Sequence, residues 1–255
     1  MATERPVRVH LLPDLVREED LAGSISVVID VLRATTTAVY ALAAGCTDIR
    51  PCLEVEEARE LANQMRAGRV VLAGERHGLP PAGFDAGNSP REFTPSLCRN
   101  STVVLTTTNG TRAIHRAAAA SRVLLAGFVN FSAVCEQLKH DQRPVHLICA
   151  GTDGEAALED TLLAGAFVDF LCDTCEVSLN DSARLAWDCY EHHGRVLLGA
   201  LEISRGGCHL KKLGLEEDIR IAAQIDRFHL IPELNRDPLR IEIGAVGIVN
   251  SHWTK

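Results

Sequence analysis

Short apolar runs recur along the chain, and each is followed by a polar or glycine-containing turn and then by a helical pattern. The runs at 26–29, 69–72, 103–105, 123–126 and 145–149 are typical of buried strands. Strands that alternate with helices of about 10 to 15 residues indicate an α/β protein with a mostly parallel or mixed sheet. Ligands collect at the carboxyl ends of strands in such sheets, so we expect the polar turns to form one site.

After about residue 175 the pattern becomes helical. We expect helices over 180–201 and 215–228 and an edge strand over 241–249. No linker or low-complexity segment interrupts the chain, so residues 1–255 are expected to form a single compact α/β unit with a helical C-terminal region. Segments 27–45 and 103–120 each combine a strand, a Thr/Arg-rich turn and an Ala-rich helix. They are either an internal duplication that gives two similar β/α halves, or two ordinary β–α units.

The composition is that of an ordinary globular protein, with 46% hydrophobic and 24% charged residues. No apolar run approaches the roughly 18 residues of a membrane span, and the N-terminus lacks the apolar core of a signal peptide. We therefore expect a cytoplasmic protein without membrane partners. The formal net charge of −8 argues against nucleic-acid binding. A small anionic ligand would need a local cluster of arginines, backbone N–H groups or a metal.

Asp30 directly follows the apolar run 26–29, at the expected mouth of the sheet. Its carboxylate could bind Mg²⁺ or act as a nucleophile, and Arg33, Thr35 and Thr36 could contact an anion. The alternative is an N-cap aspartate followed by a surface arginine. The segment has more ionisable and hydroxyl groups than capping needs, which favours a functional role.

A polar turn, TTTNGTR, separates the run 103–105 from an alanine-rich stretch. Asn109 and Gly110 can adopt positive φ, so their N–H groups could converge on an anion, and Arg112 could bind it with two hydrogen bonds. The alternative is a plain strand-to-helix turn with Thr111 as the N-cap. The chain contains neither G-x-G-x-x-G nor G-x-x-x-x-G-K-[ST], so nucleotide binding is not indicated.

Two further segments contain candidate ligands. The loop GERHG contains Arg76 between a carboxylate and an imidazole, and Asn88 lies in the long irregular stretch that follows. Long loops in compact domains are often binding loops, although these sequences also suit plain turns. Glu159 and Asp160 interrupt an apolar helical stretch, and a buried carboxylate needs a cation partner. One of them could therefore hold Mg²⁺.

Two cysteine patterns give weaker evidence of a catalytic or metal site. Cys189 and Arg195 fit the C-x5-R phosphate loop of cysteine-dependent phosphatases, and Cys172, Cys175 and Cys189 together with His192 have zinc-like spacing. Both patterns lie on helical segments without the glycine turn or knuckle that such sites need. Packing is the favoured role, and the sequence does not decide whether these cysteines do more.

Six segments, taken in order, resemble the 2-phosphosulfolactate phosphatase (ComB) family: VVIDVLRATTT, AGERHG, GFDAGNSP, LTTTNGTRA, CAGTDGEAALEDTLLAG and LKKLGLEEDI. The resemblance covers about residues 27–232, and the six weak motifs are specific as a set. It implies a three-layer α/β/α fold. It also implies Mg²⁺-dependent hydrolysis of 2-phospho-3-sulfolactate to 3-sulfolactate and phosphate, in coenzyme M biosynthesis.

The resemblance gives the polar residues distinct roles. Asp30 and one or both of Glu159 and Asp160 would bind the metal, and Asp30, Arg33, Asn109 and Arg112 would act on the transferring phosphoryl group. Arg76 and Asn88 would hold the sulfonate or carboxylate. The other expected substrate contacts are Thr35, Thr36, Thr108, Gly110 and Thr111.

Several alternatives stay open at this point. Asp30 could form a covalent phosphoaspartate instead of binding metal. The substrate could be another small phosphorylated hydroxy acid, because arginines do not distinguish sulfonate from carboxylate. A non-catalytic anion-binding regulatory protein would keep the same polar turns. The sequence does not fix the oligomeric state, a homodimer included.

Overall fold

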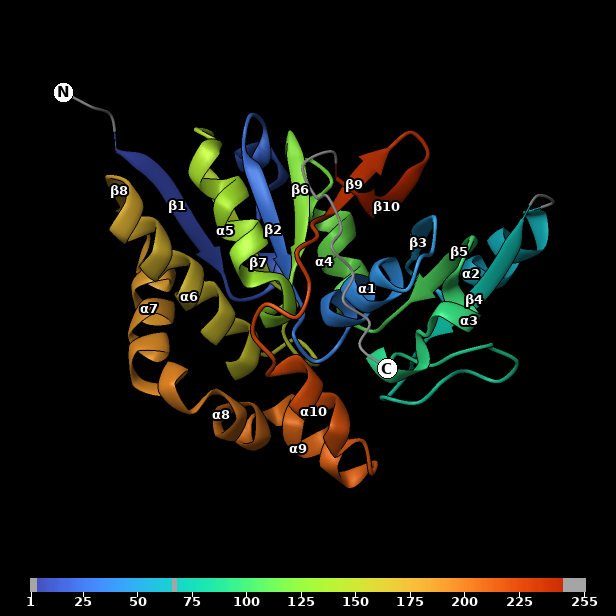
Figure 1. The fold of residues 1–255 in the computed structure, drawn as a ribbon. Helices are drawn as coiled ribbons and strands as arrows, with labels where there is room; N and C mark the ends of the chain where they lie inside the picture. The colour runs from blue at the N-terminus through green and yellow to red at the C-terminus, as the bar shows by residue number, and fades with distance from the viewer. Residues whose placement is uncertain (1–3, 66–67, 245–255) are drawn as a thin grey trace.

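Ten strands form a single sheet in the computed structural model, which describes residues 4–65 and 68–244 (Figure 1). Their order across the sheet is β4-β5-β3-β10-β9-β6-β2-β7-β1-β8. The strands are β1 (Arg5–His10), β2 (Ile25–Ile29), β3 (Asp48–Cys52), β4 (Arg69–Gly74), β5 (Ser101–Thr106), β6 (Arg122–Ala126), β7 (Val145–Cys149), β8 (Val177–Leu179), β9 (Pro232–Arg236) and β10 (Leu239–Ile243).

Two sets of parallel strands make up most of this sheet. One set contains β6, β2, β7, β1 and β8, and the other contains β3, β5 and β4. The hairpin of β9 and β10 lies between the sets and pairs antiparallel with β6 on one side and β3 on the other. The predicted α/β class with a mixed sheet is confirmed.

The predicted edge strand over 241–249 is wrong. β10 is an interior strand, because Ile241 is fully buried and pairs with Ile49 on β3 while β9 covers the other side. Residues 245–249 of that prediction lie outside the described residues.

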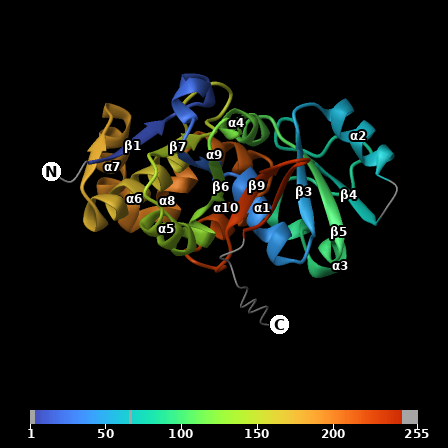
Figure 2. The ribbon, with the colours of Figure 1, turned by 90° about the horizontal axis from the view of Figure 1, so that it is seen from above.

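Helices cover both faces of the sheet (Figures 1 and 2). None of the described helices combines the length and apolar character needed to cross a bilayer. The α-helices are α1 (Ala34–Ala43), α2 (Val55–Gln64), α3 (Pro95–Cys98), α4 (Gly110–Ala117), α5 (Phe131–His140), α6 (Leu158–Thr174), α7 (Asp181–His193), α8 (Leu197–Ile203), α9 (Arg205–Lys212) and α10 (Glu216–Ala222). Short 3-10 turns span Pro13–Leu15, Glu18–Leu21, Pro90–Glu92, Phe128–Asn130 and Gly194–Val196.

The two faces of the sheet bury separate sets of side chains, because successive residues of a strand point to opposite faces. Val27 and Ile29 on β2 pack with α5, α6 and α7, whereas Val28 packs with α1 and α4. In the other set of strands, Val104 on β5 packs with α2. The three-layer α/β/α fold is therefore confirmed. The units β2–α1 and β5–α4 lie in different strand sets, and their origin by duplication stays a prediction.

The C-terminal helices are shorter than predicted. The expected helix over 180–201 is interrupted by the 3-10 turn Gly194–Val196, and the helix expected over 215–228 is only α10. α9 was not predicted, because Gly206 and Gly207 are poor helix formers. Ser204 offsets this by accepting a hydrogen bond from the Gly207 N–H at 3.0 Å, which caps the start of α9.

Candidate active site

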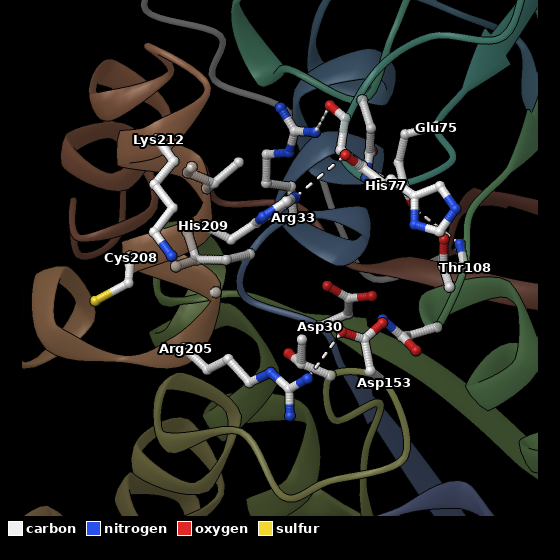
Figure 3. Close-up of a pocket in the computed structure, with 17 residues that line it drawn as sticks. Asp30, Arg33, Glu75, His77, Thr108, Asp153, Arg205, Cys208, His209 and Lys212 are labelled. Carbon is white, nitrogen blue, oxygen red and sulfur yellow. Dashed lines mark hydrogen bonds and ion pairs between the residues drawn. The ribbon is translucent and has the colours of Figure 1, made fainter.

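A cavity of about 320 Å³ lies where the carboxyl ends of β2, β4, β5 and β7 meet α9 (Figure 3). The turns after all four strands contribute side chains to it, so the predicted convergence of polar turns is confirmed. The lining includes Asp30, Arg33, Glu75, His77, Gly78, Asn88, Thr108, Asn109, Asp153, Arg205, Gly206, Cys208, His209 and Lys212.

Asp30 lies in the turn between β2 and α1 and lines the cavity. Its Oδ1 accepts a hydrogen bond from the Ala34 N–H at 3.0 Å, so the carboxylate satisfies the first N–H of α1, although the N-cap residue is Arg33. Burial raises the pKa of Asp30 to about 7, the Ala34 N–H opposes this shift, and the carboxylates of Glu75 and Glu159 add to it. Capping and a place in the cavity are therefore compatible.

Arg33 is held in a fixed orientation at the edge of the cavity. Its Nη1 donates to Asp218 Oδ2 at 2.7 Å, and its Nη2 donates to the Gly78 carbonyl at 2.8 Å. The side chains of this ion pair are only 4% and 1% exposed. Asp218 also accepts a hydrogen bond from Ser89 Oγ at 2.6 Å. These bonds join α10 and the long loop after β4 to the start of α1, so the guanidinium is oriented before any ligand arrives.

Glu75 organises the loops after β4 and β5, although no separate role was predicted for it. Its Oε1 accepts the Thr108 N–H at 2.7 Å, and its Oε2 accepts the Gly78 N–H at 2.8 Å. Thr108 Oγ1 and Asn88 Oδ1 are buried and have no hydrogen-bond partner within the described residues. Both residues line the cavity. Buried polar atoms are normally paired, so these two atoms are suited to contact a ligand.

The start of α4 differs from the prediction. Asn109 is the N-cap with a φ of −116°, and neither it nor Gly110 has a positive φ, so the predicted anion nest is wrong. The helix begins at Gly110, and Thr111, the expected N-cap, instead donates through Oγ1 to the Thr107 carbonyl at 2.8 Å. A Cβ on Gly110 would lie 2.5 Å from Asp30 Oδ2. Glycine at this position therefore lets the N-terminus of α4 approach Asp30.

Thr35 and Thr36 are fully buried and do not line the cavity. Thr35 Oγ1 donates to the Ala126 carbonyl at 2.6 Å, and Thr36 Oγ1 donates to the Val31 carbonyl at 2.9 Å. Thr35 thus fixes α1 to the end of β6, and Thr36 fixes it to the turn after β2. Their position does not support the predicted contact with substrate.

Arg76 and Arg112 also lie outside the cavity lining. Arg76 Nη2 donates to the Leu53 carbonyl at 2.9 Å and to Thr106 Oγ1 at 3.0 Å, so this guanidinium holds the loop after β4 against its neighbours. Arg112 is exposed on α4. The structure therefore does not bring either arginine to the ligand-binding residues, and neither is used in the function proposed below.

Glu159 and Asp160 are both buried in the first turn of α6. The Asp160 oxygens accept the N–H groups of Val31 and Gly151 at 2.8 and 3.0 Å, so this carboxylate ties the ends of β2 and β7 together. Glu159 Oε2 has no partner within the described residues. Burial raises the pKa of both groups, and the nearby Asp30 raises that of Asp160 further.

Within residues 4–65 and 68–244, no group of three or more His, Cys, Asp or Glu side chains is arranged to hold a metal ion. Asp30, Glu159 and Asp160 therefore do not form a complete protein cage. Mg²⁺ usually needs only one or two carboxylates, together with water and substrate phosphates. Asp30 and the unpartnered Glu159 oxygen fit this smaller donor set, because burial raises the pKa of both carboxyls and a divalent cation would stabilise their charged forms.

The cysteine patterns do not form sites of the expected kinds. Cys189 lies inside α7, so it cannot begin a phosphate loop between a strand and a helix. Cys172, Cys175 and Cys189 are partly buried and pack against the apolar core formed by β1, β2, β7 and α5 to α8. These cysteines and His192 do not form a zinc site, because none of the described His, Cys, Asp and Glu side chains gather in a group of three or more that could hold a metal ion.

α9 supplies a wall of the cavity that the sequence patterns did not predict. Arg205, Cys208, His209 and Lys212 line the cavity from this helix. Their spacing of i, i+3, i+4 and i+7 places them on one helical face. That spacing was visible in RGGCHLKK once a helix was assumed there.

Comparisons with known proteins agree with this geometry. A family model described as 2-phosphosulpholactate phosphatase matches residues 10–237. A relative from Symbiobacterium thermophilum is 39% identical over 215 residues, which are 84% of this chain and 92% of the relative. A relative from Deinococcus radiodurans is 41% identical over 230 residues, which are 89% of this chain and 92% of the relative. Both are named probable 2-phosphosulfolactate phosphatase. The chain therefore belongs to the 2-phosphosulpholactate phosphatase family.

Proposed function

We propose that the chain hydrolyses 2-phosphosulfolactate to sulfolactate and inorganic phosphate in the cavity at the carboxyl ends of β2, β4 and β5. The observation that carries the proposal is the meeting of Asp30, Arg33 and the N-terminus of α4 in one cavity. The relatives with the same family assignment are named for this reaction. The place in coenzyme M biosynthesis stays a prediction.

The chain's own residues can hold and polarise a phosphate group. Arg33 is already oriented by Asp218 and Gly78, so it can meet negative charge without rearrangement. The N-terminus of α4, beginning at Asn109, directs helical N–H groups toward an anion. The unpartnered Thr108 hydroxyl can donate a further hydrogen bond. Hydrolysis breaks the phosphorus–oxygen ester bond, adds the oxygen of water to phosphorus and returns a proton to the sulfolactate hydroxyl.

Asp30 and Glu159 are the residues that we assign to Mg²⁺. The ion would draw negative charge from a phosphate oxygen and offset the repulsion between substrate and carboxylates. The rival role for Asp30 is direct attack on phosphorus, with a phosphoaspartate that water then hydrolyses. Acid quenching during turnover of phosphorus-labelled substrate separates the two, because only the rival leaves label on the protein.

The main test is release of inorganic phosphate from 2-phosphosulfolactate over a Mg²⁺ titration, with EDTA as the reference. We expect Asp30→Asn and Arg33→Gln to lower kcat/KM by roughly 10²-fold or more, since each removes a charged group from the cavity. Arg112→Gln is the matched control, because this arginine is exposed and lies outside the cavity. If kcat/KM falls equally in all three variants, or in none of them, the cavity is not the site of hydrolysis.

The same experiment decides between the substrate classes. Turnover of another phosphorylated hydroxy acid, with none of 2-phosphosulfolactate, would assign the cavity to that acid. Thermal stabilisation by these anions without phosphate release would indicate an anion-binding protein that does no chemistry.

A further inference from the structure

One face of α9 lines the cavity. Figure 3 shows Arg205 and Lys212 on the α9 side of the cavity, with Asp30, Glu75 and Thr108 on the other side. The chain therefore has ionisable groups on two separate walls of one cavity. A substrate with a single phosphate needs only one of these walls.

The ionisable side chains of α9 differ in whether they already form ion pairs or hydrogen bonds within the protein. Arg205 forms ion pairs with Asp153 and Glu155 in the turn after β7. His209 Nε2 lies 3.2 Å from the His77 carbonyl, within hydrogen-bond distance. Lys212 has no hydrogen bond or ion pair to any described residue, yet it lines the cavity. Lys212 is therefore the cation of this wall that is available to a ligand.

The neighbouring lysine gives a direct comparison. Lys211 does not line the cavity, and its Nζ lies 3.4 Å from Glu202 Oε2. Both lysines are in the last turn of α9, where a positive charge interacts favourably with the helix dipole. A role limited to the helix terminus would therefore be shared by both residues, whereas a role in the cavity belongs to Lys212 alone.

We propose that Lys212 binds the second anionic group of the substrate, the carboxylate or sulfonate that does not react, and so determines specificity for phosphate esters that carry such a group. The proposal rests on the proposed phosphatase function. The protein has a net charge of −8, so a substrate with several negative charges needs local cations at each end. Arg33 supplies one at the phosphate, and Lys212 supplies one on the α9 side of the cavity.

Three secondary phosphate esters test this proposal: 2-phosphosulfolactate, 2-phospholactate without the sulfonate, and glycerol 2-phosphate without either anion. For Lys212→Gln we expect kcat/KM to fall about tenfold on esters that carry the recognised anion, mainly through KM. A loss on both acids identifies the carboxylate, and a loss on 2-phosphosulfolactate alone identifies the sulfonate. Glycerol 2-phosphate should be hydrolysed as by the wild type, and Lys211→Gln should match the wild type on all three.

Equal losses on all three esters, an equal effect of Lys211→Gln, or no loss in Lys212→Gln would overturn the proposal. A wild-type protein that releases no phosphate from any ester would contradict the proposed function, and calorimetric binding of sulfolactate and lactate then decides the role of Lys212. Weaker binding in Lys212→Gln alone supports the role. Binding that is equal in the three proteins, or absent in the wild type, overturns it.

Discussion

Replacing Asp30 with asparagine should stabilise the metal-free protein at alkaline pH while it removes activity. Asn can still accept the Ala34 N–H through its Oδ1, so the cap of α1 is preserved. Its amide is neutral, so the repulsion from the carboxylates of Glu75 and Glu159, which raises the pKa of Asp30, is removed. The substitution thus removes a buried charge and leaves the local hydrogen-bond pattern largely satisfied.

The magnitude follows from the pKa of Asp30, which burial raises from 3.8 to about 7. A difference of about three units corresponds to about 4 kcal/mol. Below pH 4 both the folded and unfolded forms are protonated, and the group has no effect on stability. Between pH 4 and 7 the unfolded chain releases the proton that the folded chain keeps, so wild-type stability falls as pH rises. Above pH 7 the wild type has lost this stability in full. Water in the cavity screens the Asp30 charge, so 4 kcal/mol is an upper limit for the loss.

Urea unfolding in EDTA at pH 4.5 and pH 8 measures this effect. We expect the advantage of Asp30→Asn over wild type to grow by a few kcal/mol between the two pH values. Adding Mg²⁺ at pH 8 should stabilise the wild type more than the variant if Asp30 is a ligand. Asp14→Asn is the control, because the Asp14 side chain is 95% exposed. If the free energy of unfolding changes with pH equally in wild type and Asp30→Asn, the reasoning is refuted.

Two further substitutions test the packing around the site. Asp218→Asn leaves the buried Arg33 without its counter-charge, so we expect a loss of about 3 to 5 kcal/mol in urea unfolding, and a loss below 1 kcal/mol would contradict the buried ion pair. Gly110→Ala places a methyl group 2.5 Å from Asp30 Oδ2, so kcat should fall at least tenfold and stability by about 1 to 3 kcal/mol. Gly199→Ala in α8, where a Cβ meets nothing within 4 Å, should change neither kcat nor folding adversely, and equal effects of both alanines would contradict the steric argument.

The strands that the sequence predicted share one property, which is apolar character at nearly every position. β2 and β7 are buried along their whole length, so their runs are visible without knowledge of their neighbours. β3 contains Asp48, Arg50 and Pro51, and β9 reads PELNR. Their place in the sheet depends on pairing with distant segments, and local pattern contains no information about that pairing.

The sequence identified which turns form the site, but it did not identify which side chains of those turns face the cavity. The position of Asp30, Asn88 and Asn109 follows from the rule that ligands meet the carboxyl ends of strands. Arg76 and Glu75 are adjacent, yet the carboxylate faces the cavity and the guanidinium binds the Leu53 carbonyl. Which of two neighbouring side chains faces a cavity depends on the backbone direction at that point of the loop. An irregular loop has no helical or strand repeat from which this direction could be predicted.

The unpredicted part of the site comes from the corner formed by α9 and α10, and each helix contributes one residue to the proposals above. Asp218 on α10 fixes Arg33 at the proposed phosphate position, and Lys212 on α9 lines the same cavity. A Cβ on Gly206 would collide with Glu159, so α9 lies directly against the proposed metal ligand. Displacement of this corner would separate Arg33 from its counter-charge and Lys212 from the cavity together. If both proposals hold, phosphate orientation and recognition of the second anion would depend on one segment, residues 205–222, which is why neither could be derived from the strand-and-turn pattern.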